Sequence, residues 1–405
     1  MPLWKRNLFV AWFGCFATTA GMSLIVPFLP LYIQLLGVHD TAAVERWSGI
    51  AFGSTFLMSA IVSPIWGRIA DQKGRKLMLL RASLGMAVIC SLMGFAQNVY
   101  ELTLLRLLMG SVSGYIAAAI TLIATQTPRD HAGWALGTLS TGTVGGNLIG
   151  PLVGGYLAEV IGLRNVFFAT GLMMFIAFLI TLFLVKEHFQ PSKKAAVPWR
   201  EVWRMVPNPR LVVTMMASTF ILQLAMMSIQ PIVTVYVSLL TGPSPHIALI
   251  AGCVVAASGI ANVLAAPWLG KLSDHVGPLR VLTVCLVIGG IVFIPQAFVT
   301  SPWQLMGLRF LLGLASAGLL PSINAIVKRS APDAISGRIF GYNQSAQYLG
   351  NIGGSLLGGE MAAAFGIHYV FFSTAALMLG NALWVFASGT WDHRNKRRTI
   401  PHPSV

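Results

Sequence analysis

Charge is scarce in this sequence, and acidic side chains are the scarcest charged groups. Only 10% of the 405 residues are charged, with 12 Asp and Glu against 27 Lys and Arg. Because soluble domains carry about 25% charged residues, this shortage excludes a water-soluble globule and a disordered chain. The apolar fraction of 56% indicates an integral membrane protein instead.

Cysteine is scarce too, and the signatures of metal and catalytic sites are missing. The four cysteines lie far apart in apolar segments, with no CxxC pair, so we expect neither disulfides nor a metal site. The sequence has no HExxH, GxSxG or aspartate-rich diphosphate motif, which disfavours an enzyme and predicts no cofactor. A channel is disfavoured because no ring of charges or repeated filter segment is found.

The apolar residues form twelve runs, each long enough for a helix of about 20 residues to cross a bilayer. The runs lie at about 8–36, 47–69, 77–97, 101–125, 134–158, 164–186, 210–238, 246–269, 281–300, 304–327, 337–361 and 368–388. The sequence therefore predicts an all-α integral membrane protein with two six-helix bundles. The bundles cover 1–186 and 210–390, joined by a cytoplasmic linker over 187–209 and followed by a basic cytoplasmic tail over 391–405.

The positive charges predict how these spans are oriented. With the N-terminus inside, the outside loops hold only Arg46 and Arg164, and nearly all other Lys and Arg lie in inside segments. Because positive residues favour the cytoplasmic side, both termini are expected there. This asymmetry also accounts for the net charge of +15 without a nucleic-acid partner.

The two halves of the chain repeat each other at an offset of 203 or 204 residues. Matched segments include Pro64-x-x-Gly67-x-x-x-Asp71 with Pro267-x-x-Gly270-x-x-x-Asp274, and Asn147-x-x-Gly150 with Asn351-x-x-Gly354. Because each half has an even number of spans, the halves enter the membrane in the same orientation, as parallel repeats do. Such repeats bind their cargo at the interface between the halves, so the pattern predicts alternating access.

Three motifs resemble those of the major facilitator superfamily and its drug:proton antiporters. They are Gly67-Arg68-Ile69-Ala70-Asp71-Gln72-Lys73-Gly74-Arg75-Lys76 between spans 2 and 3, Leu105-Arg106-x-x-x-Gly110 in span 4, and Gly146-x-x-x-Gly150-Pro151-x-x-Gly154-Gly155 in span 5. The resemblance covers all twelve spans. It implies a proton-driven exporter of amphipathic or hydrophobic drug-like compounds in a bacterial cytoplasmic membrane, and nothing demands more than a monomer.

The loop between spans 2 and 3 is expected to act as a gate. Gly67 and Gly74 permit tight turns between helices, and the resemblance implies that Asp71 and Arg75 serve gating. Arg338 opens span 11 on the same side, so we expect an Asp71–Arg338 latch between the halves when the inside is closed. The alternative is a solvated loop whose charges only set topology.

The glycines of span 5 are expected to line one helix face. Gly146, Gly150 and Gly154 recur every four residues and permit close helix approach, and Pro151 bends the helix. The resemblance implies that this span, with Gly155, faces the other half, where a smooth surface can seal or slide. Ordinary packing within one half is the alternative.

Proton coupling needs a titratable group, yet all acids lie in loops or at span ends. The candidates are Glu101, one turn outside Arg106, and Asp71. Arg106 lies within a span, where a charge costs about 2.5–3.5 kcal/mol at the centre. The resemblance implies an internal anchor, and a snorkelled structural arginine is the alternative. The shortage of buried acids keeps open a same-fold transporter or facilitator of a small polar or anionic metabolite.

The resemblance implies that the cargo cavity is lined by spans 1, 4, 7 and 10. Adaptable methionines and polar residues at helical spacing are expected to form it, although packing against neighbours is the alternative for each of them. The candidates are Phe16, Thr19, Met22, Tyr115, Gln223, Met226, Met227, Gln230 and Asn324.

Overall fold

A computed structural model describes residues 2–187, 189, 199–242, 244 and 246–398, and these residues form an all-helical protein. The first half holds α1 (Leu3–Leu24), α2 (Leu29–Leu35), α3 (Thr41–Lys73), α4 (Arg75–Met93), α5 (Val99–Val112), α6 (Tyr115–Gln126), the 3-10 turn Arg129–His131, α7 (Ala132–Val160) and α8 (Leu163–Leu184). After α9 (Trp199–Met205), the second half holds α10 (Pro209–Ile229), α11 (Val233–Thr241), α12 (Ile247–Val276), α13 (Pro278–Gln296), α14 (Pro302–Ser316), α15 (Leu319–Ser330), α16 (Asp333–Phe365) and α17 (Ile367–Arg398).

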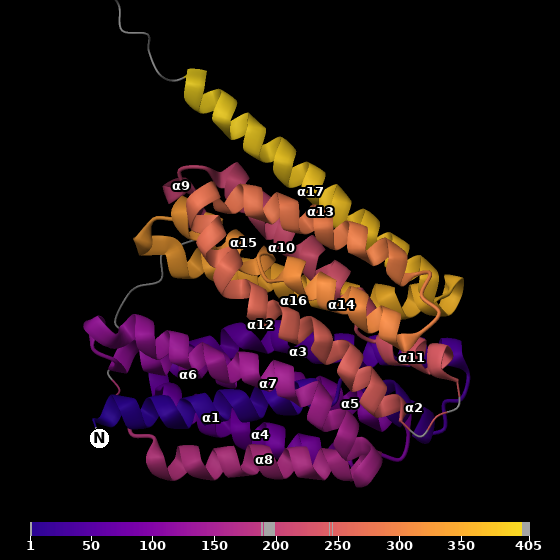
Figure 1. The fold of residues 1–405 in the computed structure, drawn as a ribbon. Helices are drawn as coiled ribbons and strands as arrows, with labels where there is room; N and C mark the ends of the chain where they lie inside the picture. The colour runs from indigo at the N-terminus through magenta and orange to yellow at the C-terminus, as the bar shows by residue number, and fades with distance from the viewer. Residues whose placement is uncertain (1, 188, 190–198, 243, 245, 399–405) are drawn as a thin grey trace, which may run out of the picture.

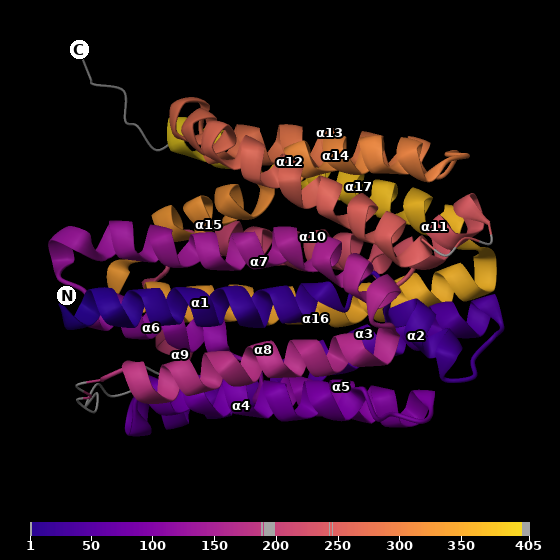
Figure 2. The same ribbon diagram turned by 60° about the horizontal axis from the view of Figure 1, so that its bottom comes forward.

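The two halves form two stacked bundles (Figure 1). Helix α3 packs against α16, and α7 packs against α12, and these two contacts make most of the interface between the halves. The N-terminus lies at one end of the molecule, and α2 and α11 lie at the other (Figure 2). We call these the N-terminal end and the far end.

Ten of the helical segments are long and apolar enough to cross a membrane. Helices α7 and α16 do not reach that apolarity because glycine and polar residues are frequent in them, but they have 29 and 33 residues. Both run alongside the other long helices (Figure 2). Together they account for the twelve predicted spans.

The four spans predicted to line a cavity are each interrupted. Breaks fall between α1 and α2, between α5 and α6, between α10 and α11, and between α14 and α15. Pro27 and Pro231 lie in the first and third breaks, where they remove a helix donor, and Gly114 in the second has a φ of +116° that favours glycine. Such breaks leave backbone groups unpaired within the depth of a membrane, which is tolerated where protein or a cavity surrounds them.

The sequence repeat is also a structural repeat. The hydroxyl of Tyr32 donates to the backbone oxygen of Met93 over 2.7 Å, and the hydroxyl of Tyr236 donates to that of Gln296 over 3.0 Å. Each tyrosine ring also packs on a phenylalanine of the last span of its half. The same anchor therefore fixes the first span of both bundles.

Candidate functional site

The glycine face of span 5 packs inside the first half. A Cβ built at Gly146 would lie 2.7 Å from the backbone oxygen of Phe16, and a Cβ at Gly154 would lie 2.2 Å from that of Leu24. Gly150 approaches α1 in the same way. These glycines therefore allow α7 and α1 to touch, which is the packing role expected of small residues at this spacing.

Pro151 and Gly155, one residue further along α7, face the second half instead. A Cβ at Gly155 would lie 2.5 Å from the backbone oxygen of Ala248 in α12. A Cβ at Gly252 would lie 2.4 Å from the backbone oxygen of Pro151. The motif of span 5 thus serves two neighbours, because one face of it packs on α1 and another packs on α12.

An equivalent glycine contact joins α3 to α16. A Cβ at Gly49 would lie 2.4 Å from the backbone oxygen of Ser355, and a Cβ at Gly359 would lie 2.6 Å from that of Glu45. In the repeat, Gly49 corresponds to Gly252 and Gly359 to Gly155. The two halves therefore meet through two copies of one packing arrangement.

Polar contacts between the halves gather at the same end. Arg46 donates two hydrogen bonds to the carboxylate of Glu360, with N–O distances of 2.7 and 2.9 Å. The carboxylate of Glu159 lies 2.9 Å from the His246 ring and accepts a backbone N–H from the start of α12. We call these pairs, with the two glycine contacts, the far-end seal.

A further hydrogen bond joins the broken spans of the two halves. The hydroxyl of Thr234 at the start of α11 donates to the backbone oxygen of Pro27 over 2.9 Å. Proline 27 lies in the break between α1 and α2, so the break leaves this oxygen free to accept. This buried contact adds to the far-end seal.

The N-terminal end lacks this close packing. A Cβ built at Gly133 or Gly137 of α7, or at Gly337 or Gly341 of α16, would meet no atom within 4 Å. The same two helices that touch the other half at the far end therefore have room around them here. Close contact of α7 and α16 with the other half is therefore found at the far end, while these four positions at the N-terminal end have open space around them.

The signature motif between spans 2 and 3 lies at this end, but it is mostly helical and not a loop, because residues 67–73 continue α3 and only Gly74 separates α3 from α4. Asp71 forms an ion pair with Arg75, and the carboxylate of Glu187 accepts the backbone N–H groups of Arg75 and Lys76 over 2.8 and 2.7 Å. Gly74 has a φ of +91°, which accounts for glycine at this turn. Arg338 lies on α16 without an ion pair to Asp71. The latch was predicted for a closed inside, so it stays a prediction.

Arg106 is buried within the first half. Its side chain is 2% exposed, its guanidinium carbon lies 4.9 Å from the centre of the Phe52 ring, and its Nε and Nη2 have no partner among the described residues. Arg309, its repeat equivalent, is 7% exposed and leaves the same two nitrogens without a described partner. Both arginines are buried within their own half, and the role of Arg106 as an internal anchor stays a prediction.

Glu101 does not contact Arg106 in the described chain. Its carboxylate is exposed and accepts hydrogen bonds from the backbone of Gln97 and the side chain of Asn98. These contacts stabilise the start of α5, where an acid also complements the helix dipole. The geometry gives Glu101 a capping role.

The predicted cavity residues divide into two groups. One group belongs to spans 1 and 7, where every residue except Thr19 is partly exposed and fits the lining of a space between the halves. Thr19 is buried, and its hydroxyl lacks a described partner. These residues are Phe16, Thr19, Met22, Gln223, Met226, Met227 and Gln230. Asn324 is exposed on α15. Tyr115, by contrast, is 1% exposed and its hydroxyl hydrogen-bonds to Thr181, so it lies in the core of the first half.

A small pocket of about 150 Å³ lies beside the break in span 4. The Arg81 guanidinium stacks on the Trp66 ring at 3.7 Å and donates to the backbone oxygen of Ser113 over 2.8 Å. Its Nε and Nη1 have no described partner. Tyr348 from α16 also lines this pocket, so it opens toward the interface between the halves.

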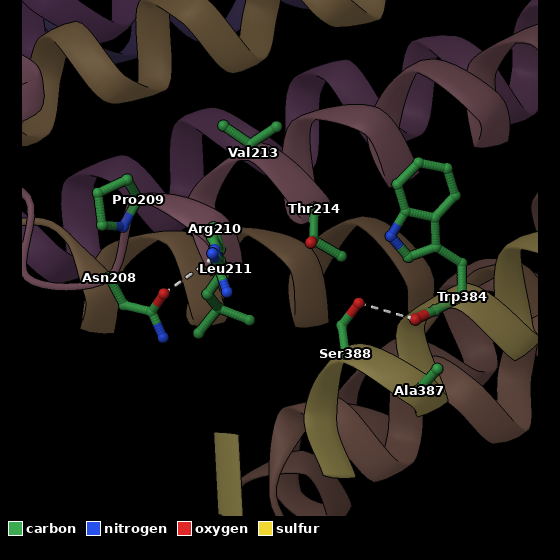
Figure 3. A pocket seen from close by; sticks show the side chains of 9 residues that line it. All are labelled: Asn208, Pro209, Arg210, Leu211, Val213, Thr214, Trp384, Ala387 and Ser388. Atoms are coloured by element: carbon green, nitrogen blue, oxygen red, sulfur yellow. Dashed lines mark hydrogen bonds between the residues drawn. The ribbon is translucent and has the colours of Figure 1, made fainter. Parts of the chain in front are cut away.

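A larger groove of about 680 Å³ lies between α10 and α17. Figure 3 shows Val213 and Thr214 of α10 on one side and Trp384 of α17 on the other. All of its lining residues belong to the second half, so this groove is separate from the interface between the halves.

Sequence reasoning overlooked two of these features. Glu45 is 3% exposed, although it lies near the start of α3 where the sequence predicts a loop or a span end. In the sequence, Arg81 stands out only as one of the positive charges that predict the cytoplasmic side. The adjacent Trp66 and the Gly114 break were the available hints, since each is unusual at the depth of a span.

Comparisons with known proteins agree with this architecture. The profile of the Major Facilitator Superfamily matches residues 11–248 and 215–403. The multidrug resistance protein MdtG of Salmonella arizonae is 50% identical over 396 residues, covering 98% of this chain and 97% of the relative. MdtG of Dickeya zeae is 48% identical, with 95% of each chain covered.

Two solved structures share the fold at low sequence identity. A bacterial homologue of the human lysosomal transporter Spinster, in an inward-facing and occupied conformation, has a TM-score of 0.79 and 16% identity over 96% of this chain and 97% of that chain. The human organic anion transporter MFSD10 (TETRAN) has a TM-score of 0.70 and 15% identity, covering 95% of this chain and 100% of that chain.

Proposed function

The chain belongs to the major facilitator superfamily, and we propose that it exports amphipathic or hydrophobic drug-like compounds by proton-coupled alternating access. The proposal rests mainly on one observation. Helices α7 and α16 touch the other half closely at the far end, whereas their glycines at the N-terminal end have open space around them. A carrier that exposes its cargo site to one side at a time requires this asymmetry. The MdtG relatives, named for multidrug resistance, support the choice of cargo.

We assign the N-terminal end to the cytoplasm of a bacterial cell, so that both termini lie on the cytoplasmic side of the inner membrane. The distribution of Lys and Arg supports this orientation. The structure then represents an inward-facing state, with the far-end seal shut toward the outside. A monomer is sufficient, because both gates and the interface come from one chain.

Conversion of the carrier to an outward-facing state requires the far-end seal to open and the cytoplasmic ends of the two halves to close. Asp71 would then exchange Arg75 for Arg338, which lies on α16 at the same end. An exposed ion pair contributes only about 0.2–1 kcal/mol, so the exchange costs little in either direction. This small difference suits a latch that has to open in every cycle.

Cargo would bind between α1 and α10. Met226 and Met227 offer flexible, polarizable side chains, while Gln223 and Gln230 can hydrogen-bond to polar groups of the cargo. No described acid lines this space. The cavity therefore favours neutral or weakly charged amphipathic compounds.

Dye efflux from proteoliposomes tests the proposed function. The full chain is reconstituted with a fluorescent lipophilic dye, and either a pH gradient or a membrane voltage alone is imposed. We expect transport driven by the pH gradient. Transport that ignores both gradients would show a facilitator, and an absence of dye transport would refute multidrug export.

The pocket at Arg81 favours a second candidate function, transport of a small polar or anionic metabolite. Two guanidinium nitrogens there lack a described partner, and an anion is the ligand that such a group binds best. Competition separates the candidates. If a small carboxylate or phosphate blocks dye efflux and Arg81→Gln abolishes the block, the anionic cargo is favoured.

A further inference from the structure

Glu45 is the one described carboxylate that is buried. It is 3% exposed, whereas the other acids whose side chains the structure describes are exposed or partly exposed. No hydrogen bond or ion pair joins its carboxyl group to any residue of the described chain. Its position is the contact between α3 and α16, where its own backbone oxygen lies against Gly359.

The repeat shows that the fold does not need an acid at this place. The equivalent of Glu45 is Ala248, whose backbone oxygen makes the same contact with Gly155 and whose side chain is also buried, at 6% exposure. One copy of the packing arrangement therefore carries a methyl group where the other carries a carboxyl group. A structural role alone does not account for the difference.

Charged groups near this end do not neutralise Glu45. Arg46 donates two hydrogen bonds to Glu360, and both of these side chains are about half exposed, at 52% and 55%. Arg106 lies beside Phe52, two helical turns further along α3. The remaining ionisable groups of α2, α5 and the loop before α3 at this end are the exposed His39, Asp40, Tyr100 and Glu101 and the buried phenol of Tyr32, which donates to the backbone oxygen of Met93.

A carboxylate without a partner is strongly disfavoured in a dry contact, because ionisation there loses hydration and gains nothing. The neutral form of Glu45 is therefore favoured while α3 and α16 are in contact. When the far-end seal opens, α16 moves away from α3, and the carboxyl group meets water and can ionise. Closure must then take up a proton.

We propose that Glu45 is the proton-binding residue of the far-end seal. Its carboxylate accepts a proton from the external solution as α16 closes over α3, and the same O–H bond breaks when α16 moves away, which returns the proton to external water. This inference rests on the proposed alternating access and not on the identity of the cargo. It links external acidity to the step that returns the empty carrier to the inward-facing state.

The proposal fixes the sign and the size of a pH effect. The closed form holds one more proton than the open form, so closure is favoured at low pH and lost as pH rises. One proton of difference changes the ratio of open to closed molecules by up to about tenfold per pH unit. The His246 ring also lies 2.9 Å from the Glu159 carboxylate across this end, so the test includes variants without His246.

The test measures the far-end opening directly in the full chain without cargo. Spin labels are attached at Tyr100→Cys and Phe298→Cys, which are exposed at 70% each and lie at the far end in different halves. The four native cysteines are replaced by alanine, and label distances are measured in lipid nanodiscs from pH 5 to pH 8. We expect the open fraction to rise with pH in the parent and in His246→Gln.

Substitutions at Glu45 decide the proposal. Glu45→Gln mimics the neutral acid and should keep the seal closed at every pH, and Glu45→Ala, which copies Ala248, should also remove the dependence on Glu45. The proposal is overturned if either variant, made in the His246→Gln background, keeps the parental pH slope, or if the parent shows no slope. Failure of dye transport would leave this result intact.

The repeat supplies a gain-of-function arm. Ala248→Glu places a second acid in the equivalent contact and should steepen the slope toward about a hundredfold per pH unit. Ala248→Gln is the control of equal size, and it should change the open fraction but not the slope. Equal slopes for the two variants would refute proton binding at this pair of positions.

Discussion

Gly155→Ala should push the carrier out of the inward-facing state. In the sealed far end, the added methyl group would lie 2.5 Å from the backbone oxygen of Ala248 and 2.9 Å from the Cα of Leu249. Both neighbours are backbone atoms of α12, so no side chain can rotate away. The clash exists only while α7 and α12 touch, and it disappears once the far end opens.

The size of the effect follows from the cost of overpacking. Inserting a methyl group into a well-packed contact costs about 1–3 kcal/mol, and 1.4 kcal/mol is about tenfold in an equilibrium constant. The ratio of closed to open molecules should therefore fall by about 5- to 150-fold. The helix propensity gained by replacing glycine is the same in both states and cancels.

Label distances across the far end measure this ratio, and the same helix supplies two matched controls. Gly137→Ala adds its methyl group where nothing lies within 4 Å, so the ratio should not change. Gly154→Ala adds it 2.2 Å from the backbone oxygen of Leu24 in α1, so it should lower the melting temperature of the protein. A shift in the ratio for Gly137→Ala, or none for Gly155→Ala, would refute the assignment of the far-end seal.

Three further predictions concern charged residues. Asp71→Asn should slow dye transport several-fold at normal expression, because the latch loses its anion; unchanged turnover would remove the latch from the mechanism. Arg106→Met should keep or raise the melting temperature, since two buried nitrogens no longer lack partners, and should lower transport at least about tenfold if Arg106 anchors the cycle; normal transport would leave it a structural role. Arg46→Glu should lower the closed fraction about two- to fivefold, as expected for an exposed pair, and Glu360→Arg in the same chain should restore it; label distances without restoration would contradict the pairing.

The spans and their repeat could be predicted because they depend on local composition. A run of apolar residues predicts a membrane helix wherever it occurs, and the paired motifs at a constant offset predict two similar bundles. The structure and the family match confirm that fold. The breaks in the four cavity spans were less accessible, because glycine and proline also occur in helices that continue through them, as Pro64 does in α3.

The neighbours of a residue could not be predicted from its spacing. Gly154 and Gly155 are adjacent in one motif, yet Gly154 packs on α1 and Gly155 on the other half. A rotation of about 100° separates them on the helix, and the sequence does not say which helix lies on each side. Tyr115 shows the same limit, since its hydroxyl points to Thr181 within one bundle.

The burial of an acidic side chain could not be predicted from the sequence either. Glu45 and Glu101 both lie near the outer ends of predicted spans, so hydropathy treats them alike. The structure separates them, because α16 covers Glu45 while Glu101 faces solvent and caps α5. Contact between distant segments decides the difference, and neither local pattern nor charge density records it.

The repeat explains why a carrier with few charges can still hold a defined closed state. Two glycine contacts of the same geometry, Gly49 with Ser355 and Gly252 with Pro151, close the far end on both sides of the interface. Packing of this kind carries no charge, so it does not respond to pH or salt. The chain can therefore restrict its chemical sensitivity to the places where the copies differ. Glu45 replaces the Ala248 of the other copy at such a place, and a single proton there acts on a seal whose glycine contacts are unaffected by acidity.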